Sequence, residues 1–145
     1  MSQRIYSRCW LHLMWATVEQ QKYIEPDARG KISDYLLEYS SLKEIFMAAN
    51  FVYSNHVHVL VDLPAEYTID ELTKLLKGRT ANWVNENRLM TMRFAWESGF
   101  AAFSVSQSSF EEVKKYFANQ NEYHRKRSYQ EELEAFLSAY KIDQH

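Results

Sequence analysis

Four stretches of the chain have the hydrophobic pattern of β-strands. Residues 5–18 form the first of these: Cys9, Leu11, Leu13 and Trp15 alternate with Trp10, His12, Met14 and Ala16, as in a largely buried strand. The other predicted strands cover about residues 46–53, 56–62 and 100–106. The second and third are separated only by Ser54 and Asn55, residue types typical of a hairpin corner.

Between and after these strands, apolar residues recur at helical spacing. Predicted helices cover about residues 25–45, 68–88, 109–125 and 128–140, and the last three follow Ser/Thr-x-x-Glu capping boxes at Thr68, Ser108 and Ser128. The order β-α-β-β-α-β-α-α begins with the ferredoxin-like arrangement. We therefore predict an α+β fold, an antiparallel sheet with helices on one face and additional C-terminal helices. The other face of the sheet is left for solvent, a partner subunit or a ligand.

The composition fits one ordinary globular domain spanning residues 1–145. Only 3 glycines and 2 prolines leave little room for linkers, and the single cysteine excludes a disulfide framework or a thiolate zinc cluster. The N-terminus has no apolar signal core and no stretch approaches 18 apolar residues, which predicts a cytoplasmic protein without a membrane span.

Basic residues form two clusters although the net charge is −2. One cluster extends over residues 74–93, mostly within the helix predicted at residues 68–88, and the other over residues 114–127, within and just after the helix predicted at residues 109–125. Such clusters are compatible with a polyanionic partner, although a charged helix face is more often simply solvated.

His56 and His58 lie two residues apart in the strand predicted at residues 56–62. Side chains alternate along a strand, so both imidazoles would lie on one face while Val57, Val59 and Val61 fill the other. Two adjacent imidazoles can chelate a metal ion, but the pattern alone also fits a half-buried strand with polar residues on one side.

A third ligand is required for a catalytic metal, and the helix predicted at residues 109–125 offers candidates. Tyr116, Gln120 and His124 recur every fourth residue along one edge of this helix. Alternatively, Tyr116 is a core-edge residue and the other two side chains face solvent.

Four segments together resemble the insertion-sequence-200-like transposases. They are "SNHVHVLVDLP" at residues 54–64, "TIDELTKLLKGRTANWVNEN" at 68–87, "WESGFAAFSVS" at 96–106 and "VKKYFANQNEYHRKRSYQEELEAFL" at 113–137. These transposases are single-tyrosine members of the histidine-hydrophobe-histidine (HUH) nuclease superfamily, which also includes the tyrosine transposases associated with repetitive extragenic palindromes (REPs). The resemblance extends from about residue 10 to residue 142.

The resemblance implies a DNA transposase that cleaves and rejoins single-stranded DNA through a covalent 5′-phosphotyrosine intermediate. Tyr116 matches the nucleophile, and His56, His58 and Gln120 match the ligands of a divalent metal, Mg²⁺ or Mn²⁺. No nucleotide cofactor is expected, because the phosphotyrosyl bond retains the energy needed for rejoining. Tyr123 stands where the family often has the first of two histidines, which puts an auxiliary role at that position in doubt.

The resemblance also implies partners, namely hairpin-forming single-stranded DNA and a second copy of the chain in a homodimer. The candidate DNA contacts are Lys74, Lys77, Arg79, His124, Arg125, Lys126 and Arg127. Two alternatives stay open. One is a non-catalytic nucleic-acid-binding descendant of the same fold with a regulatory role, and the other is a metal-dependent phosphodiesterase that uses water.

Overall fold

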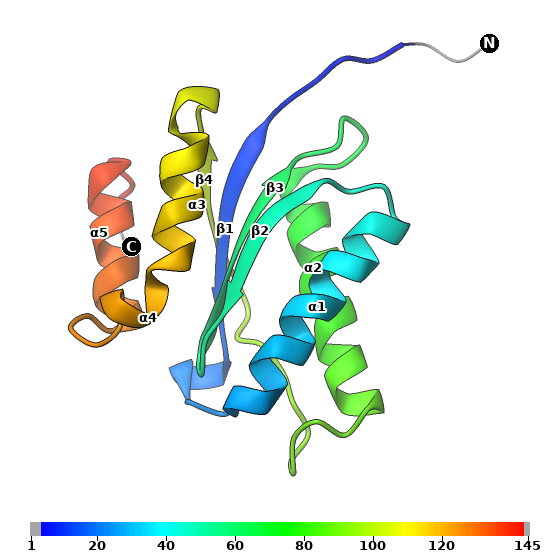
Figure 1. Ribbon diagram of the computed structural model, residues 1–145, viewed down its shortest axis with the longest axis vertical. Helices are drawn as coiled ribbons and strands as arrows, with labels where there is room; N and C mark the ends of the chain where they lie inside the picture. The colour runs from blue at the N-terminus through cyan, green and yellow to red at the C-terminus, as the bar shows by residue number, and fades with distance from the viewer. Residues whose placement is uncertain (1–3, 144–145) are drawn as a thin grey trace.

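A computed structural model describes residues 4–143 of the chain. Figure 1 shows an antiparallel sheet placed between two groups of helices. Its elements in chain order are β1 (Trp10–Ala16), α1 (Pro26–Leu42), β2 (Met47–Val52), β3 (His56–Asp62), α2 (Ile69–Glu86), β4 (Ala101–Val105), α3 (Phe110–Ala118), α4 (Gln120–Tyr123) and α5 (Tyr129–Ala139). Short 3₁₀ turns occupy Val18–Gln20 and Gln107–Ser109. The predicted α+β, ferredoxin-like arrangement is confirmed.

The strand order is β2-β3-β1-β4, and each neighbouring pair is antiparallel. β3 is therefore an inner strand, with Met14 of β1 opposite His58 and Phe51 of β2 on the other side of it. The hairpin between β2 and β3 turns at Ser54 and Asn55, where the Tyr53 N–H donates to the His56 carbonyl at 2.9 Å. Both β3 histidines therefore lie on an inner strand, with His56 opposite Ala16 at the end of β1.

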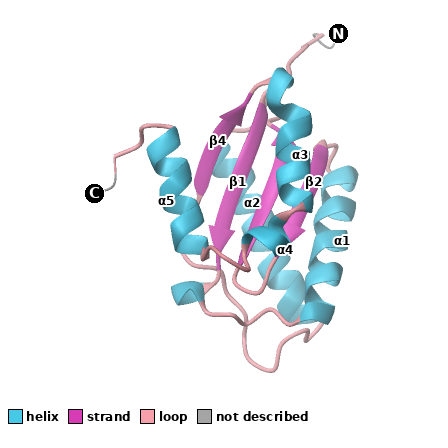
Figure 2. Cartoon of the chain, turned by 60° about the vertical axis from the view of Figure 1, so that its left-hand side comes forward, coloured by secondary structure: helices cyan, strands magenta, loops and turns pink. Residues whose placement is uncertain are grey.

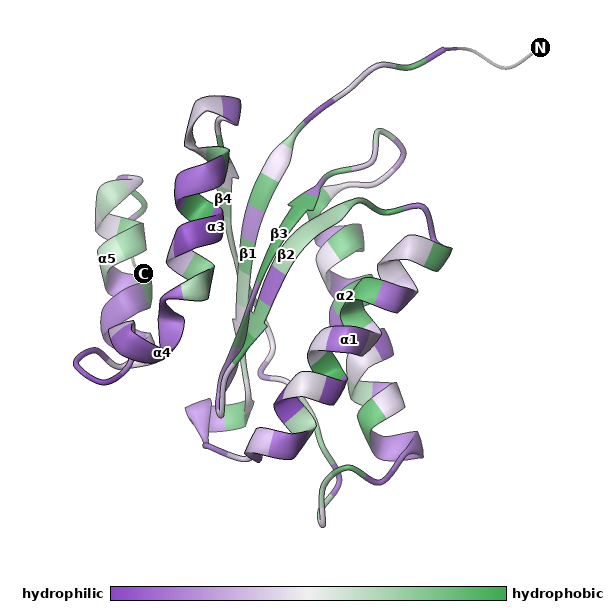
Figure 3. Cartoon of the chain, viewed as in Figure 1, coloured by the Kyte–Doolittle hydropathy of each residue, from purple (hydrophilic) through white to green (hydrophobic). Residues whose placement is uncertain are grey.

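One face of the sheet packs against α1 and α2 and forms the larger apolar core. Val57, Val59 and Val61 of β3 face this core together with Leu72 and Leu76 of α2. α2 begins with the predicted capping box, because the Thr68 hydroxyl accepts from the Glu71 N–H and the Glu71 carboxylate accepts from the Thr68 N–H. Figure 3 shows hydrophobic and hydrophilic bands along both helices, as expected of helices that bury one side.

The opposite face is covered by α3, α4 and α5 of the same chain (Figure 2). Phe117 of α3 packs near Trp10 and Leu60, and Phe136 of α5 packs against Phe103 of β4. The sequence left the cover of this face open, and the structure shows that the chain supplies it. Both faces of the sheet therefore carry helices.

Three boundaries differ from the sequence prediction. β1 begins at Trp10 and not near residue 5, because β3 and β4 pair with it no further than Asp62 and Val105. The capping box predicted at Ser108 is wrong: a 3₁₀ turn precedes α3, and the Ser106 hydroxyl accepts from the Ser109 N–H. The single helix predicted at residues 109–125 is interrupted at Asn119, where the backbone leaves helical geometry between α3 and α4.

Candidate metal and nucleophile site

The two β3 histidines occupy the face covered by α3, α4 and α5. Val57 points into the opposite core, so the alternation of the strand turns His56 and His58 toward the same side. Both are fully buried, and their Nε2 atoms are 3.2 Å apart. The predicted pairing of the two imidazoles on one face is confirmed by this geometry.

Hydrogen bonds at Nδ1 orient two imidazoles of the cluster, those of His56 and His124. The Asn55 amide nitrogen donates to the Gln20 carbonyl at 3.3 Å, so its oxygen is the atom 2.8 Å from Nδ1 of His56. Nδ1 of His124 lies 2.8 Å from the carbonyl oxygen of Arg127. Both partners are acceptors, so Nδ1 donates in each case, and Nε2 of each ring faces the cluster.

His58 has a different neighbour, the buried His12 of β1. Nε2 of His12 lies 2.7 Å from Nδ1 of His58, and the two rings are stacked with centroids 5.0 Å apart. Burial, reinforced by the charge of His58, lowers the pKa of His12 well below its usual value. His12 is thus a neutral hydrogen-bonding neighbour that fixes the orientation of the His58 ring.

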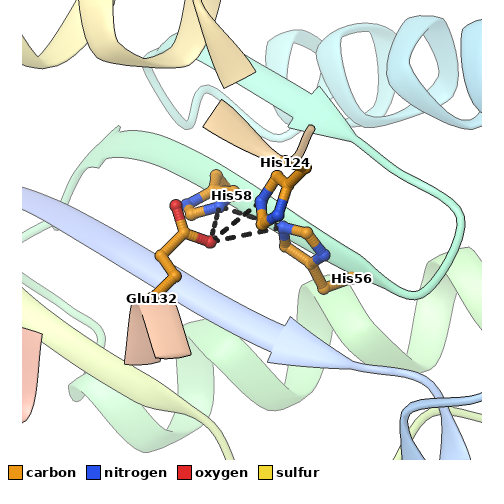
Figure 4. A group of neighbouring side chains, drawn as sticks. All are labelled: His56, His58, His124 and Glu132. Atoms are coloured by element: carbon orange, nitrogen blue, oxygen red, sulfur yellow. Dashed lines mark hydrogen bonds and ion pairs between the residues drawn. The ribbon is translucent and has the colours of Figure 1, made fainter. Parts of the chain in front are cut away.

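Glu132 of α5 inserts a fully buried carboxylate among these rings, as Figure 4 shows. Its Oε1 lies 3.1 Å from His58 Nε2, 3.2 Å from His124 Nε2 and 3.5 Å from His56 Nε2. Burial alone would raise the pKa of Glu132, but hydrogen bonds from His124 and His58 outweigh it and lower that pKa. Glu132 therefore stays an ionised carboxylate.

Tyr116 and Gln120 reach the same carboxylate from α3 and α4. The Tyr116 hydroxyl donates to Glu132 Oε2, and the Gln120 amide nitrogen donates to that oxygen at 2.9 Å. Burial, together with the hydrogen bond to Glu132, raises the pKa of Tyr116 well above its usual value. The phenol is therefore fully protonated at neutral pH.

The donor set fits a divalent cation. Ligand atoms of His56, His58, His124 and Glu132 all lie within 4.8 Å of one another. Metal–ligand bonds of about 2.1 Å place neighbouring ligand atoms about 3.0–3.4 Å apart, close to the spacings around Glu132 Oε1. The Gln120 amide oxygen also lies 2.9 Å from Nε2 of His124, so it adds a further potential ligand atom to this group.

Comparison with known proteins identifies the family. The family model described as "Transposase IS200 like" matches residues 5–120, most of the chain. The chain belongs to the IS200-like transposases. No curated protein matches it.

Two solved structures share the fold of this transposase. A candidate transposase from Deinococcus radiodurans R1 is 20% identical, with a TM-score of 0.62 over 83% of this chain and 97% of that one. A REP-associated tyrosine transposase bound to a REP hairpin is 10% identical, with a TM-score of 0.62 over 86% of this chain and 73% of that one. At these identities the likeness shows the fold alone.

The transposase fold gathers the four residues predicted as nucleophile and metal ligands. Tyr116 lies beside His58, with ring centroids 6.0 Å apart, and Gln120 is fully buried within the cluster. All four come from one chain, although the sequence left open whether the tyrosine helix completes the site of another subunit. Their catalytic roles stay predictions.

His124 was predicted as a DNA contact, but the structure places it within the cluster. Its side chain is only 3% exposed. This burial favours a place among the metal-binding atoms over a contact at the surface.

The remaining basic residues divide between the two faces of the transposase. Lys74, Lys77 and Arg79 belong to α2, across the sheet from Tyr116 (Figure 1). Lys77 is occupied by the loop before β4, because its Nζ donates to the carbonyls of Glu97 and Gly99 at 2.8 and 2.6 Å. The exposed run Arg125–Arg127 joins α4 to α5, directly beside the cluster. The predicted DNA contacts therefore do not form one surface.

The sequence reasoning missed Glu132 and His12. Glu132 stands three residues after Tyr129 and four before Phe136, within the apolar stripe of its helix. A charged residue at a buried helical position was the available signal. The sequence signal for His12 was weaker, because its contact with His58 depends on the register of β1 against β3.

No helix among residues 4–143 combines the length and apolar character needed to cross a bilayer.

Proposed function

We propose that this transposase cleaves and rejoins single-stranded DNA by metal-assisted transesterification, with Tyr116 as the nucleophile. The observation that supports it best is the shared carboxylate: the Tyr116 hydroxyl and the imidazole cluster contact the same side chain, Glu132. Nucleophile and metal-binding atoms are therefore neighbours within one chain.

In the proposed cleavage, the Tyr116 oxygen bonds to phosphorus while the bond between phosphorus and the 3′ oxygen breaks. The phenol gives up its proton, the leaving oxygen gains one, and a 5′-phosphotyrosine and a free 3′-hydroxyl result. Rejoining reverses these steps with another 3′-hydroxyl. A bound Mg²⁺ or Mn²⁺ would polarise a phosphate oxygen and offset negative charge at the reacting phosphate.

The residues of the chain have distinct tasks in this scheme. His56, His58 and Gln120 would hold the cation, while Asn55 and His12 keep two of the imidazoles in place. Imidazole nitrogens combined with oxygen ligands suit Mn²⁺ better than Mg²⁺. A phenol is ordinarily protonated at neutral pH, so the reaction has to include removal of the Tyr116 proton.

The substrate we propose is single-stranded DNA that carries a hairpin. One of the structurally similar transposases is bound to a REP hairpin, and the exposed basic run 125–127 of this chain joins α4 to α5 next to His124 of the cluster. A single tyrosine attaches one cleaved end at a time, so processing two element ends requires two copies. We therefore propose a homodimer in which each chain contributes a complete site.

The test is the formation of a protein–DNA adduct that survives SDS. Labelled single-stranded DNA that carries the end of the transposable element encoding the protein is incubated with the protein and Mn²⁺ or Mg²⁺. We expect an adduct with the native protein and none with Tyr116→Phe. Tyr123→Phe is the matched control, because the Tyr123 ring lies 5.7 Å from that of Tyr116 and should be dispensable.

Three other results would contradict the proposal. Binding without an adduct indicates the non-catalytic descendant, and turnover that survives Tyr116→Phe without an adduct indicates a hydrolytic phosphodiesterase. An adduct that is lost only in Tyr123→Phe would move the nucleophile to α4.

A further inference from the structure

The two oxygens of the Glu132 carboxylate face different groups. Oε1 faces the imidazole nitrogens of His56, His58 and His124 at 3.1–3.5 Å. Oε2 accepts hydrogen bonds from the Tyr116 hydroxyl and from the Gln120 amide. One side chain therefore touches both halves of the site.

The fold of α5 fixes this placement. The Ser128 hydroxyl accepts from the Glu131 N–H and the Glu131 carboxylate accepts from the Ser128 N–H, so a capping box begins the helix immediately before Glu132. On either side of Glu132, Tyr129 packs on the His56 ring and Phe136 stacks on Phe103. Anchors on both sides hold the carboxylate at the centre of the cluster.

A buried carboxylate has to be neutralised by a nearby positive charge, and no lysine or arginine among the described residues forms an ion pair with Glu132. Among residues 4–143, the ion-pair partners of Glu132 are imidazoles alone. Burying a carboxylate costs free energy unless the group is paired, and a divalent cation at the centre of these ligand atoms would offset that cost.

We propose that Glu132 bridges the metal and the nucleophile, with Oε1 as a metal ligand and Oε2 as the hydrogen-bond acceptor that positions the Tyr116 hydroxyl. This inference rests on the proposed function and adds a residue from α5 to it. The stretch matched by the family model ends at residue 120, so Glu132 lies outside it. Metal binding at Oε1 would then also fix the position of the Tyr116 hydroxyl, because that hydroxyl donates to Oε2 of the same carboxylate.

The first test measures Mn²⁺ binding by calorimetry, without DNA. Glu132→Gln keeps the shape of the side chain and removes its charge, and we expect its affinity to fall by at least about 10- to 100-fold. Glu134→Gln is the matched control, since Glu134 is exposed on the same helix, and its affinity should equal that of the native protein. Equal affinities for Glu132→Gln and the native protein would overturn the proposal.

Glu132→Asp separates the role of the charge from a purely structural role. It retains the carboxylate on a shorter stem, so it should bind Mn²⁺ more tightly than Glu132→Gln does. If Asp and Gln weaken binding equally while circular dichroism shows both variants folded, Glu132 is structural and the bridge is excluded.

The second test examines the tyrosine end of the bridge. 3-Fluorotyrosine placed at position 116 reports its surroundings through the ¹⁹F resonance. We expect that resonance to shift on saturation with Mg²⁺ in the native protein and to shift much less in Glu132→Gln. An equal shift in both proteins would exclude the bridge.

These measurements do not depend on the DNA reaction. If no adduct forms but the Mn²⁺ affinities and the ¹⁹F shifts behave as expected, the proposed function fails and the bridge stands. If the adduct forms and Glu132→Gln binds Mn²⁺ normally, the bridge fails and the proposed function stands.

Discussion

The two faces of the sheet use the same strands for different purposes. On the side of α1 and α2, β3 presents Val57, Val59 and Val61 to a continuous apolar core. On the side of α3 and α5, it presents His56 and His58 to a polar cluster. Apolar patches still flank this cluster, one under α3 and one under α5.

This difference separates stability from chemistry. Burying apolar surface stabilises the fold, whereas burying imidazoles and a carboxylate costs free energy unless each has a partner. The first face should therefore dominate unfolding, and the second should dominate metal binding and cleavage. Because adjacent residues of β3 point to opposite faces, paired substitutions can test this division directly.

The largest effect is expected on the polar face, from His58→Ala. Removing a direct ligand should weaken Mn²⁺ binding by more than the roughly 100-fold that loss of an outer-shell partner costs, and should abolish the DNA adduct. Calorimetry and the adduct assay measure both. Val59→Ala, its neighbour on the other face, should retain both activities while folded, and a loss of Mn²⁺ binding in that variant would contradict the division.

The next effect concerns the apolar face. Leu72 of α2 is fully buried in the core, so Leu72→Ala should lower the free energy of unfolding by about 2–5 kcal/mol. Urea denaturation measures this change. Adduct formation per folded molecule should stay at the native level, and a large decrease would show that the faces are coupled.

A smaller effect is expected when the orientation of an imidazole is released. Asn55→Ala removes the acceptor for Nδ1 of His56, and Mn²⁺ affinity should fall by roughly 10- to 100-fold. Asn50 is the matched control, because its side chain bonds to Ser33 of α1 on the other side of the sheet. Asn50→Ala should leave Mn²⁺ affinity unchanged, and similar losses in both variants would contradict this account of His56.

The smallest effect is expected at the surface. Lys126 is exposed beside the cluster, whereas Lys74 is exposed on α2 and pairs with Asp70 at 2.9 Å. Lys126→Ala should reduce the salt dependence of single-stranded DNA binding by about 0.7 in the log–log slope, the value for one lost phosphate contact. Lys74→Ala should not change that slope, and fluorescence anisotropy at several salt concentrations distinguishes the two.

Local patterns in the sequence were sufficient for most of the fold. β3 begins and ends where its alternation predicted, and two helices begin at their predicted capping boxes. The break at Asn119 was missed because Tyr116, Gln120 and His124 keep helical spacing across it. The side chains of Tyr116, Gln120 and His124 still lie on one side despite the interruption at Asn119. They therefore contact the histidine cluster as the spacing predicted.

The missing parts of the site depend on contacts between distant segments. Spacing within β3 indicated that His56 and His58 share a face, but only the packing of α5 brings Glu132 to them. The contact between His12 and His58 likewise depends on the pairing of β1 with β3. Met14 is directly opposite His58, so His12, two residues before Met14, lies diagonally across from His58 on the same face of the sheet. Such contacts follow from sheet register and helix docking, which no short-range pattern specifies.

The burial of the cluster has a kinetic consequence. His56, His58, Gln120 and Glu132 are all fully buried, so in the proposed reaction a DNA phosphate would reach them only if the helices that cover the cluster move. A turnover would then include an opening step, and the rate of that step would set an upper limit on the rate of cleavage. DNA that traps the open form would be bound slowly and released slowly, whatever the intrinsic reactivity of Tyr116.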